Sequence, residues 1–204
     1  MLKLDPNSHD AVIFDCDGTL VDTMPLHHTA WQSAFTRFGA PFEFSWELFM
    51  RRAGMTIEQT VKELNGEFDC ELPVDGVAAA QRAEYGRLSA KVRPIPNVMA
   101  FARNVSTRHP IAVASGSTRT CVEDALAQVS ALELFATIVT PADVERGKPA
   151  PDMFLLAAER LSVHPRRCLV IEDGDLGLQA AQSAGMDAFR VDRFGGVQWL
   201  PLRE

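Results

Sequence analysis

Residues 12–23 read Val-Ile-Phe-Asp-Cys-Asp-Gly-Thr-Leu-Val-Asp-Thr, an apolar run that ends at two aspartates one residue apart. The run predicts a buried strand. Because strand side chains alternate between two faces, Asp15 and Asp17 should point the same way and Cys16 into the core. Gly18 allows the backbone to turn directly after them. Two crowded carboxylates repel each other, and a hard cation such as Mg²⁺ relieves that repulsion. The alternative, an acidic turn that caps a helix, leaves the polar residues of the later strands unexplained.

The composition limits the classes of function. The chain has 204 residues, which suits one core with a smaller inserted unit. It carries 27 acidic and 20 basic residues, and its sequence pI is near 5.3. We expect no basic patch for nucleic acid or for an anionic membrane, so any recognition of phosphate must be local.

The cysteines and the apolar runs indicate a compartment. Cys16, Cys70, Cys121 and Cys168 are far apart and have no metal-binding spacing with the histidines, which predicts free thiols in a reducing environment. No apolar run approaches the ~18 residues of a membrane span, and the first residues lack the apolar segment of a signal peptide. We expect a cytoplasmic protein, and a monomer.

Short apolar runs alternate with helical patterns along much of the chain. The runs expected to be strands are 11–14, 111–115, 137–140, 168–171 and 187–191. Such alternation is typical of an α/β fold with a parallel sheet. Two further patterns, one after Lys148 and one that ends at Gly185, predict helices with an apolar face toward the sheet.

A long stretch between the first two strands interrupts this alternation. Residues 21–93 have helical periodicity and no convincing strand, so we expect a helical cap inserted into a core of residues 1–20 and 94–204. Pro94 and Pro96 are disfavoured inside a helix or central strand and suit the linker that leaves the cap. A cap at this place can close over a bound substrate.

Polar residues stand where the later strands end. Ser115 follows the second strand, Lys148 lies in Arg-Gly-Lys-Pro-Ala-Pro-Asp, and Glu172 and Asp173 follow the fourth. Open α/β sheets bind ligands at this edge. A hydroxyl and turn amides can bind phosphate oxygens, a lysine can neutralise their charge, and an acidic pair can complete a metal site. Each motif is weak alone, but their agreement predicts a phosphate site with a metal.

These motifs resemble the four motifs of the haloacid dehalogenase superfamily, over nearly the whole chain. Asp-x-Asp-Gly-Thr-Leu-x-Asp-Thr, Gly-Lys-Pro-Ala-Pro-Asp and Glu-Asp-x-x-x-Gly are similar to its β-phosphoglucomutase-like branch, and closest in appearance to fructose-1-phosphate phosphatases. The resemblance implies a Rossmann-like core with a helical cap, Mg²⁺ as cofactor and a small phosphorylated sugar as substrate. The roles that it implies are Asp15 as nucleophile, Asp17 as general acid and base, Ser115 and Lys148 as the phosphate-stabilising pair, and Asp15, Asp17 (through its carbonyl), Glu172 and Asp173 as metal ligands.

Further residues beside these motifs are expected to bind substrate. They are Gly18, Thr19, Thr23, His27, Gly116 and Arg119. The resemblance implies that Thr23 orients Asp17 and that His27 is a cap-hinge histidine in contact with substrate; the alternative is a structural histidine. Arg119 follows the Ser115 loop and is expected at phosphate or sugar, with a solvated arginine at a helix start as the alternative.

The chemistry expected of the two aspartates is phosphoryl transfer in two steps. Asp15 attacks phosphorus to form an aspartyl-phosphate, while Asp17 protonates the departing alkoxide and then activates water. This requires pKa values that are pushed apart, with Asp15 ionised by the metal and Asp17 protonated until needed. Asp17 argues against dehalogenation, because a departing halide needs no proton.

A phosphomutase shares this intermediate, so the cap must decide between the two reactions. In β-phosphoglucomutases a cap arginine grips a second phosphate, and the corresponding position here holds Ile57, which cannot make that contact. Arg51 and Arg52 are close enough in sequence to compensate. Gly174 also replaces the serine that commonly follows the Glu-Asp pair. We favour a sugar-phosphate phosphatase and keep β-phosphoglucomutase as the alternative.

Two other classes of protein fit the sequence less well. A non-enzymatic phospho-acceptor domain of the response-regulator type carries its acceptor on a middle strand and has no cap, whereas Asp15 lies on the first strand before a long insertion. A P-loop is excluded because Pro149 follows Gly147 and Lys148, where serine or threonine is required. The tail, residues 192–204, gives no functional signal: Trp199 and Leu200 could dock on the core, or Gly195 and Gly196 could leave them mobile.

Overall fold

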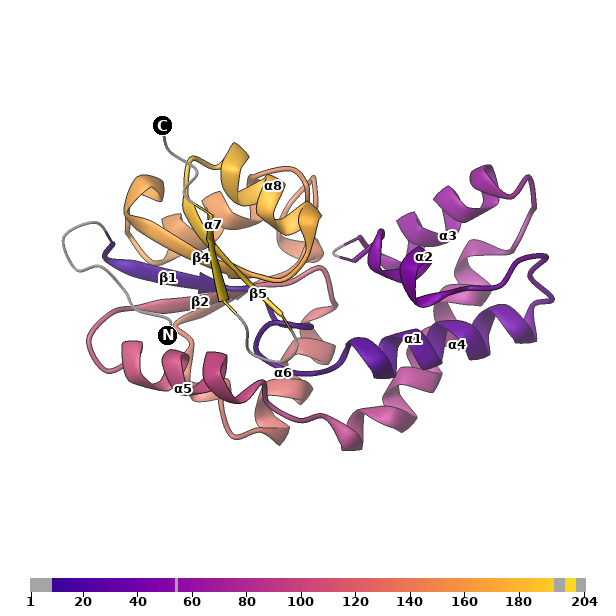
Figure 1. Cartoon of the computed structure of the whole chain (residues 1–204), viewed down its shortest axis with the longest axis horizontal. Helices are drawn as coiled ribbons and strands as arrows, with labels where there is room; N and C mark the ends of the chain where they lie inside the picture. The colour runs from indigo at the N-terminus through magenta and orange to yellow at the C-terminus, as the bar shows by residue number, and fades with distance from the viewer. Residues whose placement is uncertain (1–8, 54, 193–196, 201–204) are drawn as a thin grey trace.

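The computed structural model describes residues 9–53, 55–192 and 197–200, with side chains described up to residue 192. Its centre is a sheet with the strand order β3-β2-β1-β4-β5-β6, of which β1, β2, β4 and β5 are labelled in Figure 1. The strands are β1 (Ala11–Phe14), β2 (Ile111–Ala114), β3 (Thr137–Val139), β4 (Cys168–Glu172), β5 (Asp187–Val191) and β6 (Val197–Leu200). The predicted α/β fold is confirmed, and the five predicted strands form a parallel sheet with β1 between β2 and β4.

Strand β6 is an element that the sequence did not predict. Its backbone pairs with β5 in the antiparallel direction, with Val191 opposite Val197. It therefore closes one edge of the otherwise parallel sheet. The expectation that the side chains of Trp199 and Leu200 dock on the core, and the alternative based on Gly195 and Gly196, lie outside the described residues.

Helices cover both faces of the sheet, with α5 and α6 on one face and α7 and α8 on the other (Figure 1). They are α5 (Pro96–Val105), α6 (Arg119–Gln128), α7 (Asp152–Arg160) and α8 (Asp175–Ser183). The alternation within β1 divides the core, because Val12 and Phe14 pack toward α5 and α6, whereas Ala11 and Ile13 pack toward α7 and α8. Pro151 is the N-cap residue of α7.

Of the five described α-helices between β1 and β2, the four before α5 pack together to one side of the sheet (Figure 1). They are α1 (Met24–Arg37), α2 (Trp46–Met50), α3 (Ile57–Glu67) and α4 (Val74–Leu88). Their own apolar cluster includes Trp31, Phe35, Phe44 and Leu64. We call these helices the cap and propose residues 21–93 as its bounds. Short 3-10 helices occupy Ser89–Lys91, Leu132–Leu134, Pro141–Asp143 and Pro165–Arg167.

The two linkers between cap and core run side by side. The Asp22 amide donates to the Arg93 carbonyl at 2.8 Å, and the Ile95 amide donates to the Leu20 carbonyl at 2.9 Å. Val21 and Pro94 form an isolated bridge between these two bonds. The cap is therefore joined to the core by a narrow two-stranded neck directly behind the Asp15–Asp17 turn.

All four cysteines are free thiols, as predicted, and Cys16 lies buried in the core beneath the Asp15–Asp17 turn. Among the described residues, none of the helices combines the length and the apolar character that crossing a membrane requires.

We expect the Phe14→Ala substitution to destabilise the fold strongly. Phe14 is fully buried, one residue before Asp15, between the rings of Phe101 and Phe135 at 5.9 and 6.0 Å. The cavity left behind should lower the free energy of unfolding by about 3–5 kcal/mol, measured by urea denaturation. The control is Leu155→Ala, at a side chain that is 39% exposed, where a change below about 1 kcal/mol is expected. Equal losses in both variants would contradict the described core.

Candidate active site

A buried lysine joins three elements at the carboxyl edge of the sheet. The Lys148 ammonium, from the loop between β3 and α7, donates to Asp15 Oδ1 and to Glu172 Oε2, each at 2.7 Å. Asp15 directly follows β1, and Glu172 ends β4, the neighbouring strand. The Lys148 side chain is inaccessible to solvent, and its ammonium lies 5.2 Å from the centre of the Phe154 ring. Residues that are far apart in the sequence thus form one charged cluster, as predicted.

Two glycines make room for the carboxylates of this cluster. Gly18 has a φ of +90°, and a Cβ there would lie 2.3 Å from Asp173 Oδ2. A Cβ on Gly177, in the first turn of α8, would lie 2.0 Å from Glu172 Oε2. Thr19, next to Gly18, donates its hydroxyl to Asp173 Oδ1 at 2.9 Å. Gly18 and Thr19 therefore shape the acidic cluster here, and their predicted contact with substrate stays a prediction.

Asp17 is held separately from this cluster, by hydroxyl groups. Thr23 donates to Asp17 Oδ1 at 2.6 Å, which agrees with the orienting role implied for it. Ser117 and Ser115 donate to Asp17 Oδ2 at 2.7 and 3.3 Å. The Asp17 carboxylate is therefore fixed from two sides, by the cap entrance and by the loop after β2.

The cap reaches Asp17 through His27. Its Nε2 lies 3.3 Å from Asp17 Oδ1, and its Nδ1 lies 3.3 Å from Nε2 of Gln81 on α4. The imidazole also stacks on the Tyr85 ring, with 3.9 Å between centroids and 6° between planes. His27 thus links the cap helices α1 and α4 to the predicted acid and base.

Burial and mutual repulsion dominate the ionisation of the acidic cluster. Burial, followed by the charge of Glu172, raises the pKa of Asp15 well above its usual range, although Lys148 opposes the rise. The same two causes raise the pKa of Asp173 to about 7, against the hydrogen bond from Thr19. Burial lowers the pKa of Lys148, but Asp15 and Glu172 outweigh it and the net shift is upward. The ammonium therefore stays charged.

In the absence of a metal, the protein groups push the pKa values of the two aspartates apart, with Asp15 above Asp17; the prediction that a metal keeps Asp15 ionised stays a prediction. Burial raises the pKa of Asp17, yet the hydrogen bonds from His27, Thr23 and Ser117 outweigh it and hold the pKa well below the usual range. The protein groups alone thus favour the ionised form of Asp17 more than that of Asp15. The sequence does not show this difference, because the donors that surround only Asp17 come from distant parts of the chain.

A cavity of about 210 Å³ lies between the cap and the edge of the sheet. Its lining includes Asp15 and Asp17, the loop of Ser115, Gly116 and Ser117, and cap residues from α1, α3 and α4. Gly116 thus faces the cavity, in keeping with its predicted place at substrate.

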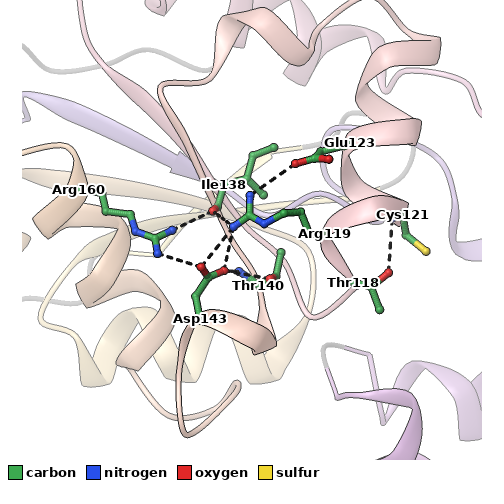
Figure 2. A network of polar contacts seen from close by, with 8 residues as sticks. All are labelled: Thr118, Arg119, Cys121, Glu123, Ile138, Thr140, Asp143 and Arg160. Atoms are coloured by element: carbon green, nitrogen blue, oxygen red, sulfur yellow. Dashed lines mark hydrogen bonds and ion pairs between the residues drawn. The ribbon is translucent and has the colours of Figure 1, made fainter.

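Arg119 lines this cavity, but its guanidinium is already engaged. It donates to both oxygens of Asp143, at 3.0 and 3.3 Å, and to the Ile138 carbonyl at 2.9 Å (Figure 2). Glu123 approaches the other amino group at 3.6 Å. Arg119 serves as a structural anchor in this arrangement, and its predicted contact with phosphate or sugar stays a prediction.

The donor set of the cluster fits a hard divalent cation. Asp15, Glu172 and Asp173 each offer a carboxylate oxygen, and these atoms lie within 4.8 Å of one another. All three acids are largely buried, and their crowding raises the pKa of two of them, so a cation would relieve the repulsion. Asp17 does not join this group through its carboxylate, consistent with the expectation that only its carbonyl would bind.

Some functional residues escaped the sequence reasoning. Ser117 makes the shorter of the two contacts that the β2 loop gives to Asp17, and its position two residues after Ser115, in Ser-Gly-Ser, was the available signal. For Gln81 and Tyr85 the sequence supported no role, because nothing in their spacing shows which face of α4 meets His27.

A comparison with known families matches residues 9–185 to the haloacid dehalogenase-like hydrolases. The chain belongs to this family. It is 35% identical to fructose-1-phosphate phosphatase YqaB of Escherichia coli K12, over 88% of this chain and 95% of that protein. It is 29% identical to β-phosphoglucomutase of Bacillus subtilis 168, over 89% of this chain and 82% of that protein.

A solved structure of a putative β-phosphoglucomutase from Bacteroides vulgatus has the same fold, with a TM-score of 0.78 at 28% identity, and covers 91% of this chain and 76% of that one. The resemblance inferred from the motifs is confirmed. Membership of a hydrolase family with phosphatase relatives makes this chain a hydrolase of phosphoric monoesters.

Because of the acidic cluster, we expect the protein to lose stability as the pH rises from 5 to 8 when no divalent cation is present. Asp173 has a folded pKa of about 7 against an ordinary value of 3.8, so the folded state retains a proton that the unfolded state releases. Asp15 acts in the same direction. Asp17 is ionised and Lys148 protonated in both states over this range, so neither offsets the loss. The free energy of unfolding should fall by roughly 2–4 kcal/mol.

Chemical denaturation with a chelator present measures this slope, and Mg²⁺ should restore more stability at pH 8 than at pH 5. The Asp173→Asn variant should flatten the slope. Stability that rises between pH 5 and 8 in the chelated wild type would contradict the description of the cluster.

Proposed function

We propose that this protein is a phosphatase of small phosphorylated sugars, with fructose 1-phosphate as the first candidate substrate, and that it acts through an aspartyl-phosphate on Asp15. The observation that carries the proposal is the buried Lys148 ammonium, bonded to Asp15 and Glu172, two carboxylates that line the cavity between the cap and the sheet. The similarity to a fructose-1-phosphate phosphatase over most of both chains supports the choice of substrate.

In the first step, Asp15 attacks phosphorus and the ester oxygen of the sugar departs. Lys148 lies beside the attacking carboxylate and offers its positive charge to the transferring phosphoryl oxygens. Ser115 is buried at the end of β2, and its hydroxyl and the following turn amides can donate to the same oxygens. The sugar alkoxide takes a proton as the bond to phosphorus breaks.

Asp17 donates that proton in the first step. A phosphate dianion in the cavity places negative charge beside Asp17 and raises its pKa from the low value set by the surrounding donors, which favours the protonated form that the first step needs. After the alcohol leaves, ionised Asp17 accepts a proton from water, and the hydroxide displaces phosphate from Asp15. Thr23 and His27 keep the carboxylate oriented through both steps.

Mg²⁺ is the proposed cofactor. Asp15, Glu172 and Asp173 would hold it, together with the Asp17 carbonyl that the resemblance implies. When bound, it supplies charge that keeps Asp15 ionised and neutralises phosphate oxygens.

The cap supports a phosphatase rather than a mutase, because the two arginines near Ile57 in the sequence, Arg51 and Arg52, are paired with an acidic side chain. Arg52 lines the cavity but is only 8% exposed, donates to the Leu48 carbonyl at 3.1 Å and pairs with Glu67. Arg51 is 60% exposed, also faces Glu67, and is absent from the described residues that line the cavity. Ile57 does line it. Neither arginine therefore replaces the cation that a second phosphate requires.

We expect the wild type with Mg²⁺ to release free phosphate from fructose 1-phosphate and the Asp15→Asn variant to lose at least 10³-fold in kcat, because the amide is no nucleophile. Free phosphate is measured with a colorimetric or coupled assay. The asparagine side chain keeps the shape of the aspartate, and the folded state of the variant is checked by circular dichroism.

β-Glucose 1-phosphate is assayed in parallel, with glucose 6-phosphate as the product to be quantified. Conversion to glucose 6-phosphate with little free phosphate would identify a mutase and overturn the proposal. A variant that retains full phosphatase activity would remove Asp15 from the mechanism.

A further inference from the structure

The carboxylate of Asp143 is the meeting point of a polar network beside the active site (Figure 2). Asp143 ends the 3-10 helix that follows β3, and its side chain is 16% exposed. It accepts hydrogen bonds from the Thr140 amide and hydroxyl at 2.8 and 3.0 Å. Arg119 donates at 3.0 Å and Arg160 at 2.9 Å. Nothing in the proposed chemistry uses this carboxylate.

The two arginines bring distant elements to Asp143. Arg119 is the first residue of α6, directly after the Ser115 loop, and Arg160 is the last residue of α7. Both guanidinium groups also donate to the Ile138 carbonyl of β3, at 2.9 and 3.1 Å. One carboxylate and one carbonyl thus tie the start of α6 and the end of α7 to the end of β3.

These tied elements carry both groups that are proposed to bind phosphate. The loop from β3 to α7 begins at Thr140, which is fully buried, and contains Lys148. Residues 140–142 line the cavity, as does the segment 115–119, which contains Ser115. Asp143 is bonded to residues at the ends of both segments, so it fixes the distance between them. Through Arg160 the same carboxylate also holds the last residue of α7, the helix that follows the Lys148 loop.

We propose that Asp143 is a positioning residue that sets the Lys148 loop and the Ser115 loop at the separation required to bind a phosphoryl group. It touches neither substrate nor metal and acts through Arg119, Thr140 and Arg160. The inference rests on the proposed function only in taking phosphate as the shared ligand of Lys148 and Ser115.

The charge of Asp143 makes its hydrogen bonds strong enough for such a role. Burial raises the pKa of Asp143, but Arg160 and Thr140 outweigh it and lower the pKa to about 2, so the carboxylate stays charged at neutral pH. Hydrogen bonds to a charged group are stronger than neutral ones. A small displacement of catalytic groups from a distance can cost far more in rate than in stability.

The test compares Asp143→Asn with the wild type by the inhibition constant of inorganic phosphate and by kcat and KM for fructose 1-phosphate. The amide keeps the size of the side chain and loses its charge. We expect the phosphate inhibition constant to rise about five- to tenfold, and kcat/KM to fall about tenfold or more. Asp143→Glu, which restores the charge, should recover part of both.

Two further variants separate positioning from loss of folded protein. Glu123→Gln removes the other carboxylate beside Arg119 and leaves the bonds of Asp143, so the phosphate inhibition constant should stay within about twofold of the wild type. Arg160→Gln removes one donor to Asp143 at a residue outside the described lining of the cavity, and should shift the constant in the same direction as Asp143→Asn.

A merely structural role would lower kcat through a smaller active fraction while leaving KM and the phosphate inhibition constant unchanged, and that result would overturn the proposal. If Asp143→Asn does not fold, the phosphate inhibition constant of Arg160→Gln decides by the same criterion.

A wild type that neither cleaves sugar phosphates nor binds inorganic phosphate, measured by calorimetry, would overturn the proposed function together with this inference. If the wild type and both variants bind phosphate equally tightly, the role of Asp143 would be overturned and the proposed function would stand.

Discussion

The buried ammonium of Lys148 between Asp15 and Glu172 is the interaction on which the rest of the site depends. Removing such a charge would leave two carboxylates desolvated and unpaired, which typically costs several kcal/mol. The cluster joins β1, β4 and the loop after β3, so the sheet order itself is required to assemble it. Asp173 adds a third acid to the cluster. Burial, followed by the charge of the neighbouring acids, raises the pKa of Asp15, and the excess of acids over lysine fits a divalent cation.

Asp17 has the opposite surroundings from Asp15, because hydrogen-bond donors and not acids lie around it. Asp17 is surrounded by donors, and one of them, His27, belongs to the cap and is itself held by Gln81 and Tyr85. A cap that moves on its narrow neck would change this contact, whereas the Lys148 cluster lies wholly within the core. The fold thus separates a fixed group of charges, suited to phosphate and metal, from a proton-carrying group whose surroundings depend on the cap.

Much of this arrangement was predictable because it is encoded locally. Strand alternation placed Asp15 and Asp17 toward the site with Cys16 in the core, and the ends of parallel strands brought Lys148 and Glu172 to the same edge. The sequence could not reveal β6, whose pairing is set by its neighbour, or the network of Asp143, which joins residues from three elements. The pKa order of the two aspartates was also out of reach, because it depends on donors contributed by distant loops.

The most direct test of the account is to trap the phosphorylated residue. The wild type, mixed with fructose 1-phosphate and Mg²⁺, is quenched during turnover and treated with borohydride, which reduces an acyl phosphate to an alcohol, and the peptides are then examined by mass spectrometry. We expect reduction at Asp15, and none at Asp17 or in protein quenched without substrate. Release of free phosphate with Asp15 unreduced, or reduction at a different carboxylate, would contradict it.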